Sequence, residues 1–324
     1  MSLIEQAAKR LEQLRKAGVE VSGSVADAAP PLAVLAADAA TRTTPTPDAG
    51  DPVAAKLLVD LPAAEPAVSR RIELDMTALA VGGLITPDAP RSQIADQYRV
   101  IKRPLIANAM GKGAAPIRRG NLIMVTSALS GEGKSFTAIN LAMSIAMELD
   151  NTVMLVDADV PKPSVLKMLG LPPARGLLDV LIDDSVDFSQ VLMRTNVEKL
   201  SLLPSGTQHA RATELLASDA MIALLDEMAT RYPDRIIIFD SPPLLMTTES
   251  RVLATHMGQV VVVVKAESTA RGDVKHALAA IESCPVKMML LNQARSSTQD
   301  GYGYGYGYGY GYGYGYGYGS SDGA

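Results

Sequence analysis

The sequence of 324 residues contains no tryptophan, three phenylalanines, three histidines and one cysteine. Because Cys284 is alone, no internal disulfide can form, and the histidines have no metal-binding spacing. The first residues, MSLIEQAAKR, carry charge too early for a secretory signal, and apolar runs such as 260–264 are too short to span a bilayer. A net charge of −5 gives no indication of nucleic-acid binding. We therefore expect a soluble, cytoplasmic protein.

Aromatic residues make up only 4% of the chain, and their distribution is uneven. Nine of the eleven tyrosines alternate with glycine near the C-terminus, and only Tyr98 and Tyr232 lie elsewhere. The nine are Tyr302, Tyr304, Tyr306, Tyr308, Tyr310, Tyr312, Tyr314, Tyr316 and Tyr318. This composition predicts that residues 301–324 form a low-complexity tail rather than a continuation of a globular domain.

The N-terminal part of the chain also differs from a globular domain. Residues 1–18 are expected to form an amphipathic helix with a capping box at Ser2 and Glu5. This helix could pack on its own domain, or it could bind a partner or a membrane surface. Residues 19–70 are rich in alanine, proline, aspartate and threonine, and we expect a disordered linker. A globular domain is then expected over 71–300.

From Leu122 onward, short apolar runs alternate with helical patterns. This order predicts an α/β fold with a doubly wound, mostly parallel sheet and helices on both faces. In such a fold, ligands bind at the carboxyl ends of the strands. The expected strands are 122–127, 152–157, 199–203, 235–240, 259–265 and 286–291. The expected helices are 134–149, 176–182, 212–231, 249–257 and 271–283.

A glycine-containing loop follows the first of these strands and leads into a helix at Lys134 and Ser135. A strand, a glycine loop and a Lys-Ser pair at a helix start are typical of a phosphate-binding loop. Lys134 would reach the β- and γ-phosphates of ATP, and the Ser135 hydroxyl would ligate Mg²⁺. The usual first glycine of this motif is replaced by Ala128. The candidate nucleotide-binding residues are Ser130, Gly131, Glu132, Gly133, Lys134, Ser135, Phe136 and Asn292, the last of which could contact the base.

Two other strands end in carboxylates. Asp157 and Asp159 follow one apolar run, and Asp240 follows another. Since the carboxyl ends of parallel strands meet at one edge, we expect these groups to face the phosphate loop. Ser135 and Asp240 suit Mg²⁺ binding, and of Asp157 and Asp159 one could hold the metal while the other accepts a proton from an attacking hydroxyl. The candidate catalytic residues are Lys134, Asp157, Asp159 and Asp240.

A helix is also expected before the first strand, from the N-cap Ser92 to about Met110. Asp96, Arg99 and Lys102 are spaced three residues apart on it, and we expect them to share one polar stripe. This stripe could be an ordinary solvated helix face.

With these motifs assembled, the chain resembles the bacterial tyrosine kinases of exopolysaccharide synthesis, and more narrowly the autokinases associated with exosortase-type systems. The resemblance is carried by SALSGEGKS at 127–135, VMLVDAD at 153–159, IIIFDSPP at 236–243 and the tyrosine-rich tail. ADQYRVIKRPL at 95–105 is similar to an oligomerisation motif of that family, which assigns this role to Asp96, Arg99 and Lys102.

The resemblance implies a P-loop fold of the type with a deviant second acidic motif, and an ATP- and Mg²⁺-dependent tyrosine autokinase. Such an enzyme would phosphorylate the tail of a neighbour in a homo-oligomeric ring and thereby regulate exopolysaccharide polymerisation or export. The implied partners are a separate membrane chain-length determinant or co-polymerase that activates the kinase, and a tyrosine phosphatase. The protein would then be peripheral at the inner membrane through its partner.

Two features leave other functions open. Position 161, where the resembling kinases carry arginine, is Pro161, with Lys162 beside it. A regular Gly-Tyr tail could also be a self-associating segment. The alternatives are a positioning ATPase of the partitioning or septum-positioning type and a non-catalytic, ATP-gated assembly scaffold. The first is disfavoured because Leu129 occupies the position of its additional loop lysine.

Overall fold

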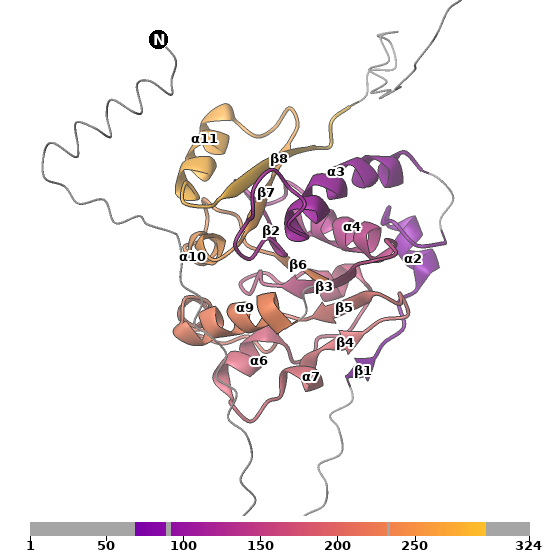
Figure 1. Ribbon diagram of the computed structural model, residues 1–324, viewed down its shortest axis with the longest axis vertical. Coiled ribbons are helices and arrows are strands. Elements are labelled where there is room, and N and C mark those ends of the chain that lie inside the picture. Colours follow the sequence, from indigo (N-terminus) through magenta and orange to yellow (C-terminus); the bar gives the residue numbers. More distant parts are fainter. Residues whose placement is uncertain (1–68, 89–91, 232–233, 296–324) are drawn as a thin grey trace, which may run out of the picture. The chain divides into compact units, whose positions relative to one another are not determined.

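The computed structural model describes residues 69–88, 92–231 and 234–295 (Figure 1). The expected N-terminal helix, nearly all of the expected linker and the tyrosine-rich tail lie outside the described residues. The first described strand is Arg70–Arg71. Among the described residues, no helix has both the length and the apolar composition needed to cross a membrane.

Eight strands form one sheet in the order β1-β4-β5-β3-β6-β2-β7-β8. They are β1 (Arg70–Arg71), β2 (Leu122–Ser127), β3 (Thr152–Asp157), β4 (Met193–Arg194), β5 (Leu200–Leu203), β6 (Arg235–Asp240), β7 (Gln259–Lys265) and β8 (Val286–Asn292). All neighbouring strands are parallel except β4 and β5, which are antiparallel. The mostly parallel sheet and the six expected strands are therefore confirmed.

The central strands are apolar because both of their faces are covered. Ile123 and Val125 of β2 belong to one core with helices α3 (Gln93–Ala109) and α4 (Lys134–Ala146). Leu122 and Met124 belong to a second core with α9 (Asp219–Arg231), α10 (Glu249–Thr255) and α11 (Arg271–Ala280). Figure 1 shows α3 and α4 on one side of the central strands and α9 and α10 on the other. This arrangement confirms the doubly wound architecture.

Ten helices occur among the described residues. They are α2 (Met76–Val81), α3 (Gln93–Ala109), α4 (Lys134–Ala146), α5 (Val165–Met168), α6 (Leu177–Ile182), α7 (Phe188–Val191), α8 (Ala212–Leu216), α9 (Asp219–Arg231), α10 (Glu249–Thr255) and α11 (Arg271–Ala280). The expected helix 212–231 is interrupted because the hydroxyl of Ser218 donates to Leu215 O and accepts from Met221 N–H. A serine side chain that bonds to nearby backbone in this way starts a new helix.

Helix α3 begins as expected, since Ser92 Oγ accepts the Ala95 N–H at 3.3 Å. Asp96 and Arg99 form an exposed ion pair at 2.5 Å, but Lys102 is buried. The expectation of one shared stripe was wrong, because six residues advance a helix to about 120° from the starting direction. Lys102 instead points towards α4.

Candidate nucleotide site

The glycine loop lies between β2 and α4, as expected from the sequence. Gly133 is the N-cap of α4 and has φ +94°, a left-handed conformation that glycine adopts without strain. Ala128 replaces the usual first glycine without conflict, because it is fully buried in the second core and its carbonyl accepts the Leu245 N–H. The loop ends at the N-terminus of a 13-residue helix, where backbone N–H groups favour phosphate.

Glu132 and Asn292 hold the shape of the loop. The buried Glu132 carboxylate accepts the Leu129 N–H at 2.6 Å and the hydroxyl of Thr269. The Asn292 side-chain amide donates to the Glu132 carbonyl at 2.9 Å. These contacts give Glu132 and Asn292 a structural part in the loop. Thr269 was not identified from the sequence, because it lies 137 positions away from Glu132 and belongs to no motif.

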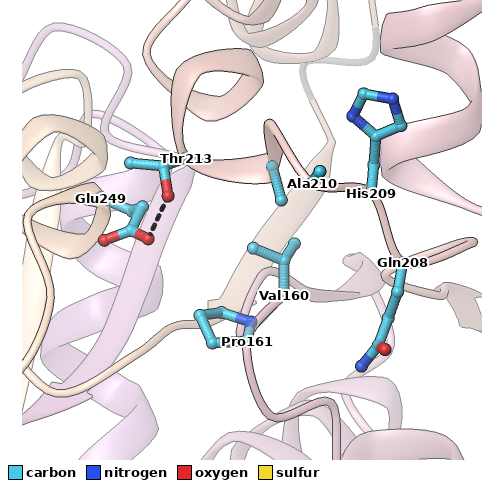
Figure 2. A pocket seen from close by; sticks show the side chains of 8 residues that line it. Val160, Pro161, Gln208, His209, Ala210, Thr213 and Glu249 are labelled. Carbon is cyan, nitrogen blue, oxygen red and sulfur yellow. Dashed lines mark hydrogen bonds between the residues drawn. The ribbon is translucent and has the colours of Figure 1, made fainter.

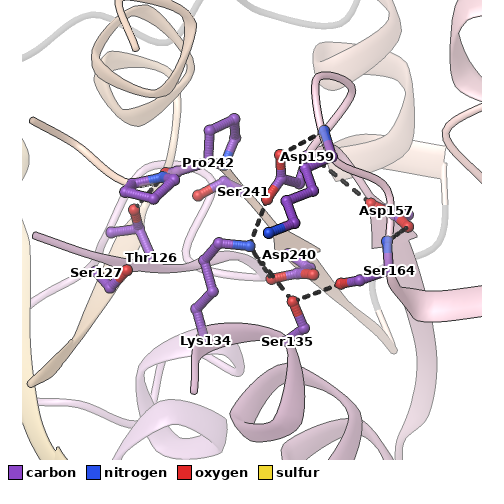
Figure 3. A network of polar contacts seen from close by, with 12 residues as sticks. Thr126, Ser127, Lys134, Ser135, Asp157, Asp159, Ser164, Asp240, Ser241 and Pro242 are labelled. Atoms are coloured by element: carbon purple, nitrogen blue, oxygen red, sulfur yellow. Dashed lines mark hydrogen bonds and ion pairs between the residues drawn. The ribbon is translucent and has the colours of Figure 1, made fainter. Parts of the chain in front are cut away.

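The ammonium group of Lys134 lies among the carboxylates at the strand ends (Figure 3). It forms an ion pair with Asp159 and lies 3.8 Å from Asp240 Oδ1. Burial opposes the charge of the amine, but Asp240 and Asp159 raise the Lys134 pKa above its usual value. Lys134 therefore remains positively charged. In the nucleotide-free protein, its charge offsets the negative charge of these two carboxylates.

Asp240 is the least satisfied of these groups. Its side chain is completely buried, and neither carboxylate oxygen accepts a well-formed hydrogen bond from a described residue, although the Ser135 hydroxyl and the Lys134 ammonium lie nearby. Burial raises its pKa from 3.8 to about 7, although Lys134 opposes this change. A buried carboxylate without hydrogen bonds calls for an external partner.

The residues at this position fit a magnesium ion. Ser135 Oγ lies 2.8 Å from Ser164 Oγ and 3.4 Å from Lys134 Nζ. Ser135, Asp159 and Asp240 therefore surround the ammonium group of Lys134. No cluster of three or more histidine, cysteine, aspartate or glutamate side chains able to hold a metal was found in the described part of the chain. Mg²⁺ is usually held by one or two carboxylates together with phosphate oxygens and water, so this sparse set suits it.

Asp157 lies in the same region but has other contacts. Its Oδ2 accepts the N–H groups of Ser164 at 3.1 Å and Val165 at 3.0 Å, which fixes the turn that leads into α5. Burial raises the Asp157 pKa from 3.8 to about 6, against the effect of these hydrogen bonds. Asp157 is therefore both an anchor for the turn and a stronger base than an ordinary carboxylate.

The other expected site residues are distributed differently. Ser130 and Gly131 are exposed at the tip of the loop, while Phe136 is half-buried and packs against the first core. Asp96 and Arg99 lie on an exposed face of α3. The nine tail tyrosines fall outside the described residues.

A pocket lies beyond the carboxyl ends of β3, β5 and β6 and has a volume of about 490 Å³ (Figure 2). Val160 and Pro161, which follow Asp159, form one wall, and His209 and Glu249 belong to later segments. No sequence motif predicts this pocket, because its lining comes from three separate segments.

Comparisons with known proteins agree with this geometry. A family model described as an AAA domain (AAA_31) matches residues 120–292. The tyrosine-protein kinase YwqD of Bacillus subtilis is 32% identical over 221 residues, which cover 68% of this chain and 89% of YwqD. The succinoglycan biosynthesis transport protein ExoP of Rhizobium meliloti is 31% identical over 173 residues, which cover 52% of this chain but only 21% of ExoP.

The structure of the chimerical protein CapA2B2 superposes with a TM-score of 0.57 at 27% sequence identity, covering 71% of this chain and 95% of that protein. The strand-end carboxylates, the loop lysine and the match to almost the whole of YwqD point to one family. The chain belongs to the bacterial tyrosine-protein kinases.

Proposed function

We propose that this tyrosine kinase transfers the γ-phosphoryl group of ATP to the tyrosines at positions 302–318 of a neighbouring copy. The observation that carries the proposal is the position of Lys134 between Asp159 and Asp240 at the end of the phosphate loop, where α4 begins. In this arrangement a bound nucleotide would replace carboxylates as the partner of the lysine. The repeated tyrosines supply phosphate acceptors on the same chain.

Each residue near the loop has a role in this proposal. Lys134 and the loop N–H groups would hold the phosphates, while Ser135, Asp159 and Asp240 would hold Mg²⁺. The metal supplies positive charge that neutralises the phosphate oxygens during transfer. Asp157 would accept the proton of the attacking tyrosine, because a pKa of about 6 makes it a better base while it remains mostly ionised at pH 7. Positioning and charge neutralisation supply most of the rate enhancement.

The cellular role follows from the family resemblance. We propose that the kinase regulates the polymerisation or export of an exopolysaccharide of an exosortase-type system, together with a separate membrane co-polymerase and a phosphatase. The match to ExoP covers a small part of a much longer transport protein, which supports a kinase that acts with a membrane component. The exposed Asp96 and Arg99 on α3 would contact the next copy in a ring, with Lys102 holding α3 in position.

The proposal is tested by the intact mass of full-length chains after incubation with ATP and Mg²⁺. One chain carries Lys134→Met, and a second has all nine tail tyrosines replaced by phenylalanine. Alone, neither should gain phosphate. When the two are mixed, the Lys134→Met chain should gain several phosphates in steps of one, because its tail is intact and its partner supplies the active site.

Three other results would contradict the proposal. Phosphate on the Lys134→Met chain alone would show that this lysine is not needed. Failure of the mixture, with wild-type chains still phosphorylated, would show that transfer occurs within one chain. Turnover of ATP by the wild type without tail phosphate, even with a membrane partner present, would favour a positioning ATPase.

A further inference from the structure

The pocket of Figure 2 lies directly beside the carboxylates of the nucleotide site. It begins at Val160, the residue after Asp159, and continues to Glu249 at the first position of α10. The segment between β5 and α8, which includes His209, closes another side. Its volume of about 490 Å³ exceeds that of one aromatic side chain, and it lies at the strand ends where ligands bind in this fold.

The walls of the pocket combine apolar and polar groups. Val160, Pro161, Ala210 and Ala212 present apolar surface, and Glu249 presents a carboxylate. None of the residues that line it is lysine or arginine. Pro161 is decisive here, because an arginine at this position would bring a cation to the pocket. With proline, this part of the wall is apolar and carries no charge.

The carboxylate gives the pocket a fixed negative charge. Glu249 is buried, and its Oε1 accepts the hydroxyl hydrogen of Thr213 at 2.6 Å. Burial raises the Glu249 pKa, but hydrogen bonds from Thr213 and from nearby backbone N–H groups outweigh this and leave the pKa below its usual value. Glu249 therefore remains ionised near pH 7, where it accepts hydrogen bonds from neutral donors and repels anions.

We propose that this pocket binds an unphosphorylated tyrosine side chain from the Gly-Tyr tail of a second copy, next to the tyrosine that reacts. The inference rests on the proposed tail phosphorylation and adds a recognition site to it. The tail between residues 301 and 319 consists of glycine and tyrosine alone, so it has no charge to conflict with Glu249. The apolar walls suit the ring, and the carboxylate accepts the phenol O–H.

The repeat of the tail matches a site with two adjacent positions. In an extended chain, residues two apart point to the same side and lie roughly 6.6 Å apart. In the proposed complex, one tyrosine lies near the γ-phosphate while its neighbour enters the pocket. A phosphotyrosine carries a charge of about −1.5 to −2 and is repelled by Glu249, so the pocket selects segments that are not yet phosphorylated.

The test measures peptide binding without ATP, using full-length protein whose nine tail tyrosines are replaced by serine. The probes are the peptide Gly-Tyr-Gly-Tyr-Gly-Tyr-Gly and the same peptide with every tyrosine phosphorylated. We expect the unphosphorylated peptide to bind at least about tenfold more tightly. Ala210→Trp should weaken its binding by a similar factor because the indole occupies the pocket. Ala220→Trp, also an exposed alanine but on α9 and outside the pocket, is the matched control and should leave the affinity unchanged.

Two charge variants test the selection itself. Glu249→Gln should bring the affinities of the two peptides closer together, and Pro161→Arg should favour the phosphorylated peptide. Thermal unfolding checks that each variant is folded, and Pro161→Arg provides the test if Glu249→Gln does not fold. Equal binding of both peptides, or no effect of either Ala210→Trp or Pro161→Arg, would overturn the proposal. Because ATP is absent, failure of tail phosphorylation is a separate result.

Discussion

The side-chain amide of Asn292 lies where an amino acid other than glycine at position 133 would place its β-carbon. A Cβ on Gly133 would be 2.1 Å from Asn292 Nδ2, well inside contact distance. The same nitrogen donates to the Glu132 carbonyl at 2.9 Å. The last strand of the sheet therefore holds the phosphate loop from the side, and the absence of a side chain at residue 133 makes this contact possible.

Gly133→Ala should lower ATP affinity at least about tenfold, because a methyl group displaces Asn292 and the backbone is already left-handed. Gly131→Ala is the matched control. Gly131 also has a positive φ, +84°, but a Cβ there meets no atom within 4 Å. It therefore reports the cost of backbone strain alone. Binding of a non-hydrolysable ATP analogue measures both, and equal losses in the two variants would show that the Asn292 contact has no effect.

Thr269→Val should weaken ATP binding about tenfold or more with little change in the fold. The substitution removes the hydroxyl that donates to the buried Glu132 carboxylate, and a hydrogen bond to a charged group contributes about 1.5 kcal/mol or more. Thr269→Ser retains the hydroxyl and should restore affinity close to wild type. If serine and valine give the same loss, the methyl group rather than the hydrogen bond positions the loop.

Asp240→Asn should change how the stability of the nucleotide-free protein depends on pH. The Asp240 pKa is about 7 when folded and near 3.8 when unfolded, so the folded state binds the proton more tightly. The contribution of this group to folding is therefore greatest below about pH 4 and is lost as the pH rises to about 7. Asparagine cannot ionise and avoids this loss.

Urea unfolding at pH 4 to 8 measures the effect. Relative to wild type, Asp240→Asn should gain a few kcal/mol in free energy of unfolding between the two ends of this range. If the difference in free energy of unfolding between Asp240→Asn and wild type stays constant with pH, the Asp240 carboxylate ionises as easily in the folded chain as in water. The variant should also lose kinase activity, since a candidate metal ligand is removed.

The sequence predicted the parts of the fold that have strong local patterns. β2, β6 and β7 are continuous apolar runs, and the acids that follow β3 and β6 met at Lys134 because parallel strands share one carboxyl edge. Two-residue strands such as β1 and β4 have no pattern long enough to recognise. The break at Ser218 depends on which hydrogen bonds a serine makes, which composition does not determine.

The finer features of the site depend on contacts between distant segments. Thr269 reaches Glu132, and Asn292 reaches the same residue, from positions far along the chain. Asp157 was expected only as a base or a metal ligand, whereas its carboxylate also accepts hydrogen bonds from the backbone N–H groups of Ser164 and Val165. Such partners become visible only when the turns between elements are placed in space.

Lys102→Met should destabilise the domain by about 1 to 3 kcal/mol, whereas Arg99→Ala on the same helix should cost less than about 0.5 kcal/mol. Lys102 is 4% exposed, donates to the Ser144 carbonyl at 2.5 Å and pairs with Glu148 at 2.6 Å. These bonds join α3 to the end of α4, the helix that begins at the phosphate loop. Within the described part of the chain, Arg99 forms an ion pair with the exposed Asp96 alone.

The two variants should separate stability from assembly. Urea unfolding gives the free energies, and light scattering gives the mass of the oligomer. Arg99→Ala should lower the measured mass of the oligomer with little change in the free energy of unfolding, since the Arg99 side chain lies on the face proposed to contact the next copy. Lys102→Met should mainly lower the free energy of unfolding. It should change the mass of the oligomer only if α3 shifts relative to α4. An oligomer that dissociates with Lys102→Met at full stability would instead place Lys102 directly at the contact between copies.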